Sequence, residues 1–299
     1  MKTEMASTCR LFAALALALL LTAPAFAQRK TDLEKEHLLG AVRSVRSQML
    51  QYFDDKQEKP WRVLPQDAVF YDASGNETAR DIYDDYGFPV GKEVSRRDAD
   101  GNRVESTLTD PKGAVMDRRV FTYENGRGTQ VIEYDGKGNA SLKQIFSYDA
   151  KERLREEVYY DPTVARAKTV YKYDEQSRLS EAAFFLSDGS KATAPIGPCL
   201  GAHRVVYFYD EKGRLVKTVA YEDDGELKRS WQNSYDAKGE IAETITDDSW
   251  STVKYTYRYE YDSQGNWIKK IRTTSHQPKL LKTKPDQYKT VTVREIVYY

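Results

Sequence analysis

Cys199 and His203 lie four residues apart in a segment rich in glycine, proline and small residues, "SDGSKATAPIGPCLGAHRVV". A cysteine becomes a nucleophile when a neighbouring base or cation favours its thiolate. A hydrolase or transferase is therefore one interpretation of this pair. No oxyanion or orienting motif accompanies it, and incidental loop residues explain the same letters. We expect a non-enzymatic protein without catalytic residues, and we keep an enzyme that uses Cys199 and His203 as the alternative.

Asp98 begins the stretch "DADGN", which resembles the start of a calcium loop. A calcium ion takes six to eight oxygen ligands, among them a bidentate glutamate at the twelfth position of such a loop. That position is Thr109 here. The histidines are also scattered, without the spacing of zinc ligands. We therefore expect no metal site and no cofactor.

Aromatic side chains are the third candidate chemistry, since the chain has 22 tyrosines and four tryptophans. Flat aromatic faces beside acids and amides suit the stacking of sugar rings. Tyrosine is also a favoured residue of half-buried strands, where its ring packs and its hydroxyl stays wet. For any one tyrosine the sequence favours this structural role, so the elements that position the tyrosines have to be considered next.

Tyrosine recurs in a motif, Tyr-Asp-x-x-Gly, that is intact six times. Aspartate at the first position of a type I turn accepts hydrogen bonds from the backbone that follows, and glycine takes the left-handed conformation that closes a three-residue hairpin loop. The motif therefore predicts hairpin turns with tyrosine at the end of the preceding strand. The residues expected to form these structural turns are Tyr71, Asp72, Gly75, Tyr83, Asp84, Gly87, Tyr134, Asp135, Gly138, Tyr209, Asp210, Gly213, Tyr235, Asp236, Gly239, Tyr261, Asp262 and Gly265.

The spacing of the turns predicts the fold class. Intact and worn copies together give fifteen turns about 13 residues apart, which leaves eight or nine residues for each strand. Between Asp174 and Asp210 one unit is ten residues longer than the others. We expect an all-β protein, a long antiparallel up-and-down meander of tandem hairpins with about sixteen strands, forming an open sheet that twists or curls.

Three segments depart from the repeat that we assign to residues 61–272. Residues 28–60 contain a capping box, Thr31 with Glu34, and predict a short helix that ends near Gly40 and is followed by a strand, although 40–52 also fits a helix. Residues 189–203 form an inserted loop. Residues 273–299 read as a basic connection followed by a final strand, "TVTVREIVYY".

Residues 1–27 have the pattern of a secretory signal peptide, with Lys2 and Arg10 before an apolar run and small residues at Ala25 and Ala27. Cleavage after Ala27 removes two basic residues and one acidic residue from totals of 46 each, which leaves a net charge of −1. A chain with no basic excess is not expected to bind nucleic acid. We expect an exported protein, periplasmic or extracellular.

The final strand resembles the last strand of an outer-membrane barrel, because it ends in an aromatic residue, Tyr299. Charged residues on both faces of most strands argue against this interpretation, since a lipid-facing lysine or arginine costs about 2–4 kcal/mol at the bilayer midplane. We expect no membrane span in the mature chain.

The tandem units resemble the YD-repeat, or RHS-repeat, family over about Val69 to Lys270. The stretches that carry the resemblance are "YDASGN", "YDDYGF", "YDEKGRL", "YDAKGEI" and "YDSQGNW". Large members of that family form β-sheet shells, and their repeats are linked to carbohydrate binding. This chain is short and looks like an exported single-domain member. The resemblance implies a binding or structural module at the cell envelope, whose ligand is an envelope polysaccharide or another protein.

Overall fold

The computed structural model describes residues 30–53, 57–161, 163–192, 201–280 and 285–299. Within these ranges, one short helix, α2 (Asp32–Lys35), precedes eighteen strands that form a single antiparallel sheet. The strands are β1 (Val42–Tyr52), β2 (Arg62–Tyr71), β3 (Glu77–Tyr83), β4 (Pro89–Arg97), β5 (Arg103–Thr109), β6 (Val115–Glu124), β7 (Arg127–Asp135), β8 (Ala140–Tyr148), β9 (Leu154–Asp161), β10 (Val164–Tyr173), β11 (Leu179–Leu186), β12 (Arg204–Tyr209), β13 (Leu215–Tyr221), β14 (Leu227–Tyr235), β15 (Ile241–Asp248), β16 (Ser251–Tyr261), β17 (Trp267–Pro278) and β18 (Asp286–Tyr298).

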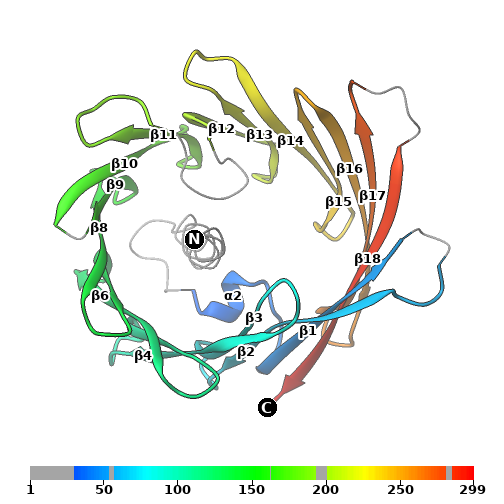
Figure 1. Cartoon of the computed structure of the whole chain (residues 1–299), viewed down its shortest axis with the longest axis horizontal. Coiled ribbons are helices and arrows are strands. Elements are labelled where there is room, and N and C mark those ends of the chain that lie inside the picture. Colours follow the sequence, from blue (N-terminus) through cyan, green and yellow to red (C-terminus); the bar gives the residue numbers. More distant parts are fainter. Residues whose placement is uncertain (1–29, 54–56, 162, 193–200, 281–284) are drawn as a thin grey trace.

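The sheet closes into a barrel, so the expected open sheet is wrong (Figure 1). The first strand, β1, pairs with β18 from Val42↔Tyr298 to Tyr52↔Lys289, and also with β2. Closure leaves neither terminal strand with an unpaired edge, which in an open sheet would be a template for aggregation. The count of about sixteen covers β2 to β17, the strands joined by the fifteen turns, and the two strands outside the repeat are those that form the seam.

The turns have the geometry that their residues predict. In the first copy, the Asp72 carboxylate accepts hydrogen bonds from the backbone N–H groups of Ser74 and Asn76, both at 2.9 Å. The Gly75 N–H donates to the Asp72 carbonyl, and Gly75 has a φ of 82°. The same backbone pattern recurs at Asp84, Asp135, Asp210, Asp236 and Asp262. The turns at Asp210, Asp236 and Asp262 join β12–β13, β14–β15 and β16–β17, so they follow one another along one rim.

Degenerate copies of the motif, which lack its glycine or its tyrosine, still form turns, and they do so in two different ways. Glu152 and Ser177 occupy the left-handed position of glycine, with φ of 66° and 62°. The copy at Glu124 differs, because Asn125 and Gly126 form a two-residue turn with φ of 51° and 77° and Glu124 pairs with Arg127. This Asn-Gly pair is the preferred sequence of a tight type I′ hairpin.

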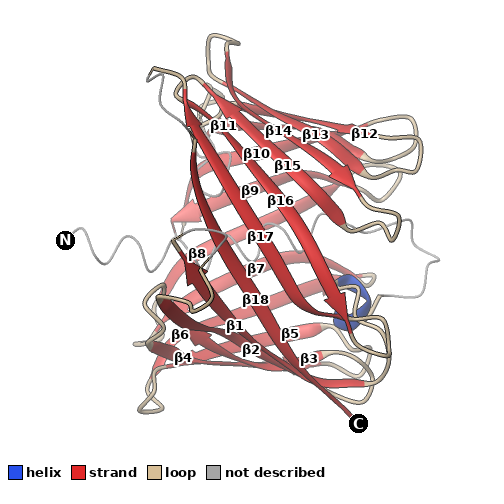
Figure 2. Cartoon of the chain, turned by 90° about the vertical axis from the view of Figure 1, so that its right-hand side faces the viewer, coloured by secondary structure: helices blue, strands red, loops and turns tan. Residues whose placement is uncertain are grey.

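The helix α2 lies inside the ring of strands and identifies the inner face of the barrel (Figures 1 and 2). Its Leu33 packs with Val42, Val45 and Tyr71 in a small apolar cluster, to which Ile296 adds. Since side chains alternate along a strand, the cross-strand pairs assign every other strand position to the inner or the outer face. One rim of the barrel lies next to α2, because the Leu33 N–H donates a hydrogen bond to the Gly75 carbonyl there. We call it the α2 rim, and its turns begin at Asp72, Asp98, Glu124, Asp149, Asp174, Asp210, Asp236 and Asp262.

The segments outside the repeat differ in part from their expected structure. The helix has the expected capping box of Thr31 and Glu34 but is a single turn, and a strand follows it. The basic connection predicted from residue 273 is largely strand, since β17 continues to Pro278 and β18 begins at Asp286. Among the described residues, no helix is long and apolar enough to cross a membrane.

Candidate functional site

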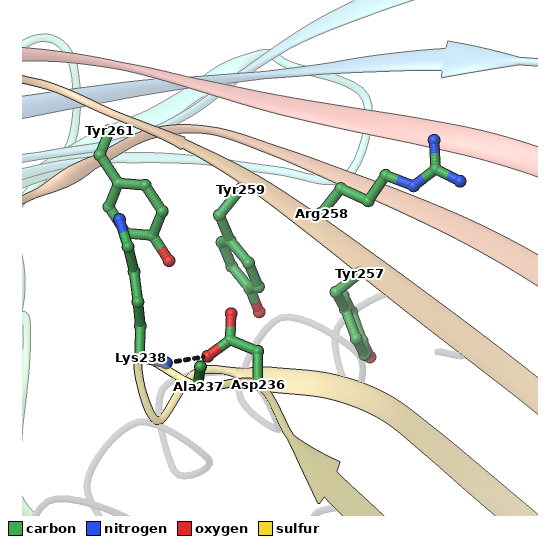
Figure 3. Close-up of a pocket in the computed structure, with 7 residues that line it drawn as sticks. All are labelled: Asp236, Ala237, Lys238, Tyr257, Arg258, Tyr259 and Tyr261. Atoms are coloured by element: carbon green, nitrogen blue, oxygen red, sulfur yellow. Dashed lines mark hydrogen bonds between the residues drawn. The ribbon is translucent and has the colours of Figure 1, made fainter.

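Strand β16 carries four tyrosines on the inner face, Tyr255, Tyr257, Tyr259 and Tyr261. They alternate with outward positions such as Arg258, which is exposed. Figure 3 shows the rings of Tyr257, Tyr259 and Tyr261 on one side of the strand and the Arg258 side chain directed away from them. Residues two apart on a strand are separated by about 6.6–6.8 Å. The strand therefore presents a row of aromatic rings to the interior, which we call the tyrosine row.

The tyrosine row borders a pocket of 460 Å³. Tyr257, Tyr259 and Tyr261 line one side of it, and the turn at Asp236 and Lys238 lines the other (Figure 3). The Asp236 carboxylate is held in its turn by the backbone N–H groups of Lys238 and Glu240, both at 2.9 Å. A fixed carboxylate beside partly exposed rings provides a hydrogen-bond acceptor at the side of an aromatic surface.

Contacts within the tyrosine row fix some rings and leave others available. The Tyr259 hydroxyl donates to the Ile241 carbonyl at 3.0 Å, and its ring lies 6.3 Å from those of Tyr261 and Trp267. Burial and the nearby Glu240 raise the pKa of Tyr259, so this phenol stays neutral. In contrast, the hydroxyl groups of Tyr255 and Tyr257 make no hydrogen bond within the described part of the chain.

Most of the motif tyrosines at the α2 rim have a structural role. Each of these side chains points inward, and its hydroxyl donates to a backbone carbonyl at the start of a preceding strand. The pairs are Tyr148 with Gly128 (2.6 Å), Tyr173 with Leu154 (2.7 Å), Tyr209 with Leu179 (2.9 Å) and Tyr235 with Leu215 (2.7 Å). Arginine side chains from the preceding turn cover the rings of Tyr173, Tyr209 and Tyr235 at 4.5–4.8 Å.

An ionic cluster lies on another part of the inner face, around Arg119. Its side chain is 6% exposed and lies within 4 Å of carboxylate oxygens of Glu93, Asp117 and Glu133. Burial and the neighbouring Glu133 carboxylate raise the pKa of Asp117 to about 7. The net charge of this cluster of three acids and one buried cation therefore changes with pH near neutrality.

The residues of the alternative enzyme interpretation are not brought together in a described site. Cys199 lies outside the described residues. His203 is 9% exposed, its Nδ1 lies 2.9 Å from the Ala192 carbonyl, and Phe185 packs edge-on against its ring. These are the contacts of a packed side chain in the barrel wall.

The calcium interpretation of Asp98 is replaced by turn chemistry. The Asp98 carboxylate accepts hydrogen bonds from the backbone N–H and the side-chain amide of Asn102, at 2.8 and 3.0 Å. Among the residues that the structure describes, no group of three or more His, Cys, Asp or Glu side chains is placed to hold a metal ion.

The tyrosine row was not predicted from the sequence, although its signal is present in "YTYRYEYD", residues 255–262. Tyrosine at every second position of a strand places all the rings on one face. The repeat drew attention to Tyr261, which belongs to a turn motif, and away from Tyr255 and Tyr257, which do not.

The outer face carries ion pairs between neighbouring strands. Lys172 of β10 pairs with Glu181 of β11 at 2.7 Å, and Lys269 of β17 pairs with Glu260 of β16 at 2.7 Å. The same arrangement joins Lys92 to Asp81, Arg96 to Glu105, Lys168 to Glu156, Arg204 to Glu181 and Lys254 to Glu243. The outer wall is therefore charged around much of the barrel.

Comparison with known proteins finds similar solved structures. The crystal structure of a porin-like protein from Bacteroides uniformis is similar over 86% of this chain and 98% of that chain, with 13% sequence identity and a TM-score of 0.45. No protein-family model matches the sequence. No curated protein matches it either.

Proposed function

We propose that this chain is an exported, non-enzymatic YD-repeat protein that binds a polysaccharide chain against the inner face of β16. The observation that carries the proposal is the tyrosine row beside the 460 Å³ pocket. Aromatic faces provide an apolar contact for a sugar ring, and polar groups at their edges provide hydrogen bonds. The hydroxyl groups of Tyr255 and Tyr257, which make no hydrogen bond among the described residues, suit such a ligand better than they suit a purely structural role.

The outer face supports the view that the barrel works in water. Its cross-strand ion pairs satisfy charges that a lipid environment would penalise. A water-exposed outer wall with an aromatic strip inside is consistent with a protein that is exported and binds its ligand within the barrel, at the cell envelope or outside the cell.

Titration calorimetry of the secreted protein with a panel of neutral oligosaccharides tests the proposal. We expect binding, and we expect Tyr257→Ala to weaken it about fivefold to tenfold, as loss of one stacked aromatic ring does. Tyr134→Ala is the matched control, because Tyr134 lies on the outer face of β7 beneath Arg118. Its affinity is expected to equal that of the parent protein.

Two outcomes count against the proposal. Equal loss of affinity in the Tyr257 and Tyr134 variants would place the ligand elsewhere. If no oligosaccharide binds and a purified protein partner saturates the barrel instead, the carbohydrate interpretation is wrong and the protein-ligand interpretation takes its place.

A further inference from the structure

Three cationic side chains gather on the inner face next to the tyrosine row. Lys270 and Arg272 of β17 stand opposite Tyr259 and Tyr257 in the antiparallel register. Arg294 of β18 lies on the same face, since Thr292, two residues before it, is paired with Lys270. We call Lys270, Arg272 and Arg294 the cationic strip.

The cationic strip has no carboxylate partner among the residues that the structure describes. Other inward arginines are neutralised, Arg97 by Asp32 and Arg119 by three acids. Within the described ranges, by contrast, no carboxylate oxygen lies within 4 Å of Lys270, Arg272 or Arg294. The nearest acidic influences on Arg294 are Glu36 and Glu240, which act over longer distances.

Aromatic contacts and burial take the place of ion pairs. The Arg294 guanidinium lies 3.4 Å and the Lys270 ammonium 5.0 Å from the centre of the Trp267 ring, and Arg272 lies 5.5 Å from the Tyr255 ring. The Nε atoms of Arg272 and Arg294 are buried without a hydrogen-bond partner, as is the hydroxyl of Thr274 next to them.

The positive charges of the cationic strip also repel one another. Burial, together with Arg294 and Arg272, lowers the pKa of Lys270. Burial lowers the pKa of Arg294 to about 10. Adjacent positive charges that are partly removed from water attract an anion strongly, because a ligand charge relieves both the repulsion and the missing hydrogen bonds.

We infer that the cationic strip binds the acidic groups of the polysaccharide, so that the ligand of this barrel is an anionic glycan whose rings contact the tyrosine row while its acid groups contact Lys270, Arg272 and Arg294. This inference rests on the proposed function and specifies the class of its ligand. Arg272 and Lys270 lie opposite Tyr257 and Tyr259, and Arg294 lies over Trp267, which pairs with Tyr261. The cationic strip therefore runs beside the tyrosine row, within reach of one sugar chain.

Two matched probes test the charge preference. They are a hexamer of galacturonic acid and the same hexamer with its carboxyl groups methyl-esterified, which keeps the rings and removes the charge. We expect the acid form to bind at least about tenfold more tightly at low ionic strength, since charge-assisted hydrogen bonds are roughly twice as strong as neutral ones. High ionic strength should remove much of that preference.

Three substitutions test the strip: Lys270→Gln, Arg272→Gln and Arg294→Gln. Each should weaken binding of the acid form by a larger factor than binding of the ester, which lowers the preference for the acid form. Lys269→Gln is the matched control, because it removes a positive charge from the outer face of β17, the strand that carries Lys270 and Arg272, and should preserve the preference. Inorganic tripolyphosphate distinguishes a glycan site from a site for any free anion. We expect it to bind more weakly than the acid hexamer and to be insensitive to Tyr257→Ala.

The outcomes separate this inference from the proposed function. If acid and ester bind equally well, the glycan site stands and the cationic strip has no role in it. If tripolyphosphate binds as tightly as the acid hexamer, the strip is a free-anion site and the inference is wrong. If neither hexamer nor any neutral oligosaccharide binds, the proposed function fails as well.

Discussion

Single residues determine the conformation of the hairpin turns in this barrel and the protonation of its buried groups. Aspartate and glycine act together in each turn, where the carboxylate satisfies two N–H groups and glycine adopts the left-handed conformation. At Gly265, with φ of 94°, a Cβ atom would lie 3.2 Å from Leu39, so space as well as conformation favours glycine. This chemistry is local, and the sequence alone predicts it.

Asp117 makes stability depend on pH in the opposite sense to most carboxylates. Its pKa is raised from 3.8 to about 7 by burial and by Glu133. Between these values the folded state binds a proton that the unfolded state does not. The free energy of unfolding therefore rises as pH falls through this window, by at most about 1.4 kcal/mol per pH unit from this group. Denaturant unfolding across the window measures the slope.

Asp117→Asn should flatten this slope, since the substituted side chain cannot titrate. Asp188→Asn is the control, because Asp188 lies in an exposed turn far from the cluster and its removal should preserve the parent slope. Identical slopes for the parent and Asp117→Asn would show that the Arg119 cluster does not hold the proton.

At the scale of elements, α2 fastens the N-terminal segment to the inner wall. The Asp32 carboxylate accepts hydrogen bonds from the Arg97 guanidinium, from the Glu77 backbone N–H at 2.9 Å and from Lys35 at 2.9 Å. The side chains of Asp32 and Arg97 are 15% and 12% exposed. A helix of one turn has no stability of its own, so these contacts and the burial of Leu33 keep it in place.

Asp32→Ala is expected to lower the free energy of unfolding by about 2–3 kcal/mol, because a hydrogen bond to a charged group contributes about 1.5–3 kcal/mol. Lys35→Ala removes an exposed partner of the same carboxylate and should cost less than about 1 kcal/mol. Denaturant titration of both variants measures the difference. Similar small losses in both would mean that α2 rests on the wall without stabilising it.

The elements that the sequence predicts best are those bounded by motif turns. Strands β2 to β17 follow from the spacing of aspartate and glycine, since hairpin formation depends on neighbouring residues. The pairing of β1 with β18 joins residues such as Val45 and Ile296, whose partnership leaves no local pattern. Because pairing between distant segments leaves no local pattern, the sequence also gives no sign that Arg272 and Arg294 face the same interior.

At the scale of the whole molecule, closure is the property that the sequence analysis did not predict. A meander of hairpins with the usual twist forms an open or a closed sheet depending on strand number and stagger, and the repeat motif fixes neither. In a closed barrel, the alternation of side chains gives every strand one side that faces the lumen and one side that faces outward. Arg119 and the tyrosine row belong to the first, and the ion pairs of Lys172 and Lys269 to the second.

The charged outer wall predicts how the whole protein behaves with detergent. A barrel that spans a bilayer exposes an apolar band, whereas here Lys172 is 67% exposed on the outer face and paired to Glu181. Each lysine or arginine placed at the midplane would cost about 2–4 kcal/mol, and several strands carry one. We therefore expect the protein to remain in the aqueous phase when a solution of a phase-separating detergent is warmed. Quantitative recovery in the detergent phase would contradict the assignment of the outer face. It would also contradict the placement of the tyrosine row and the cationic strip in the lumen, because side chains alternate between the two faces and exchanging the faces would exchange all of them.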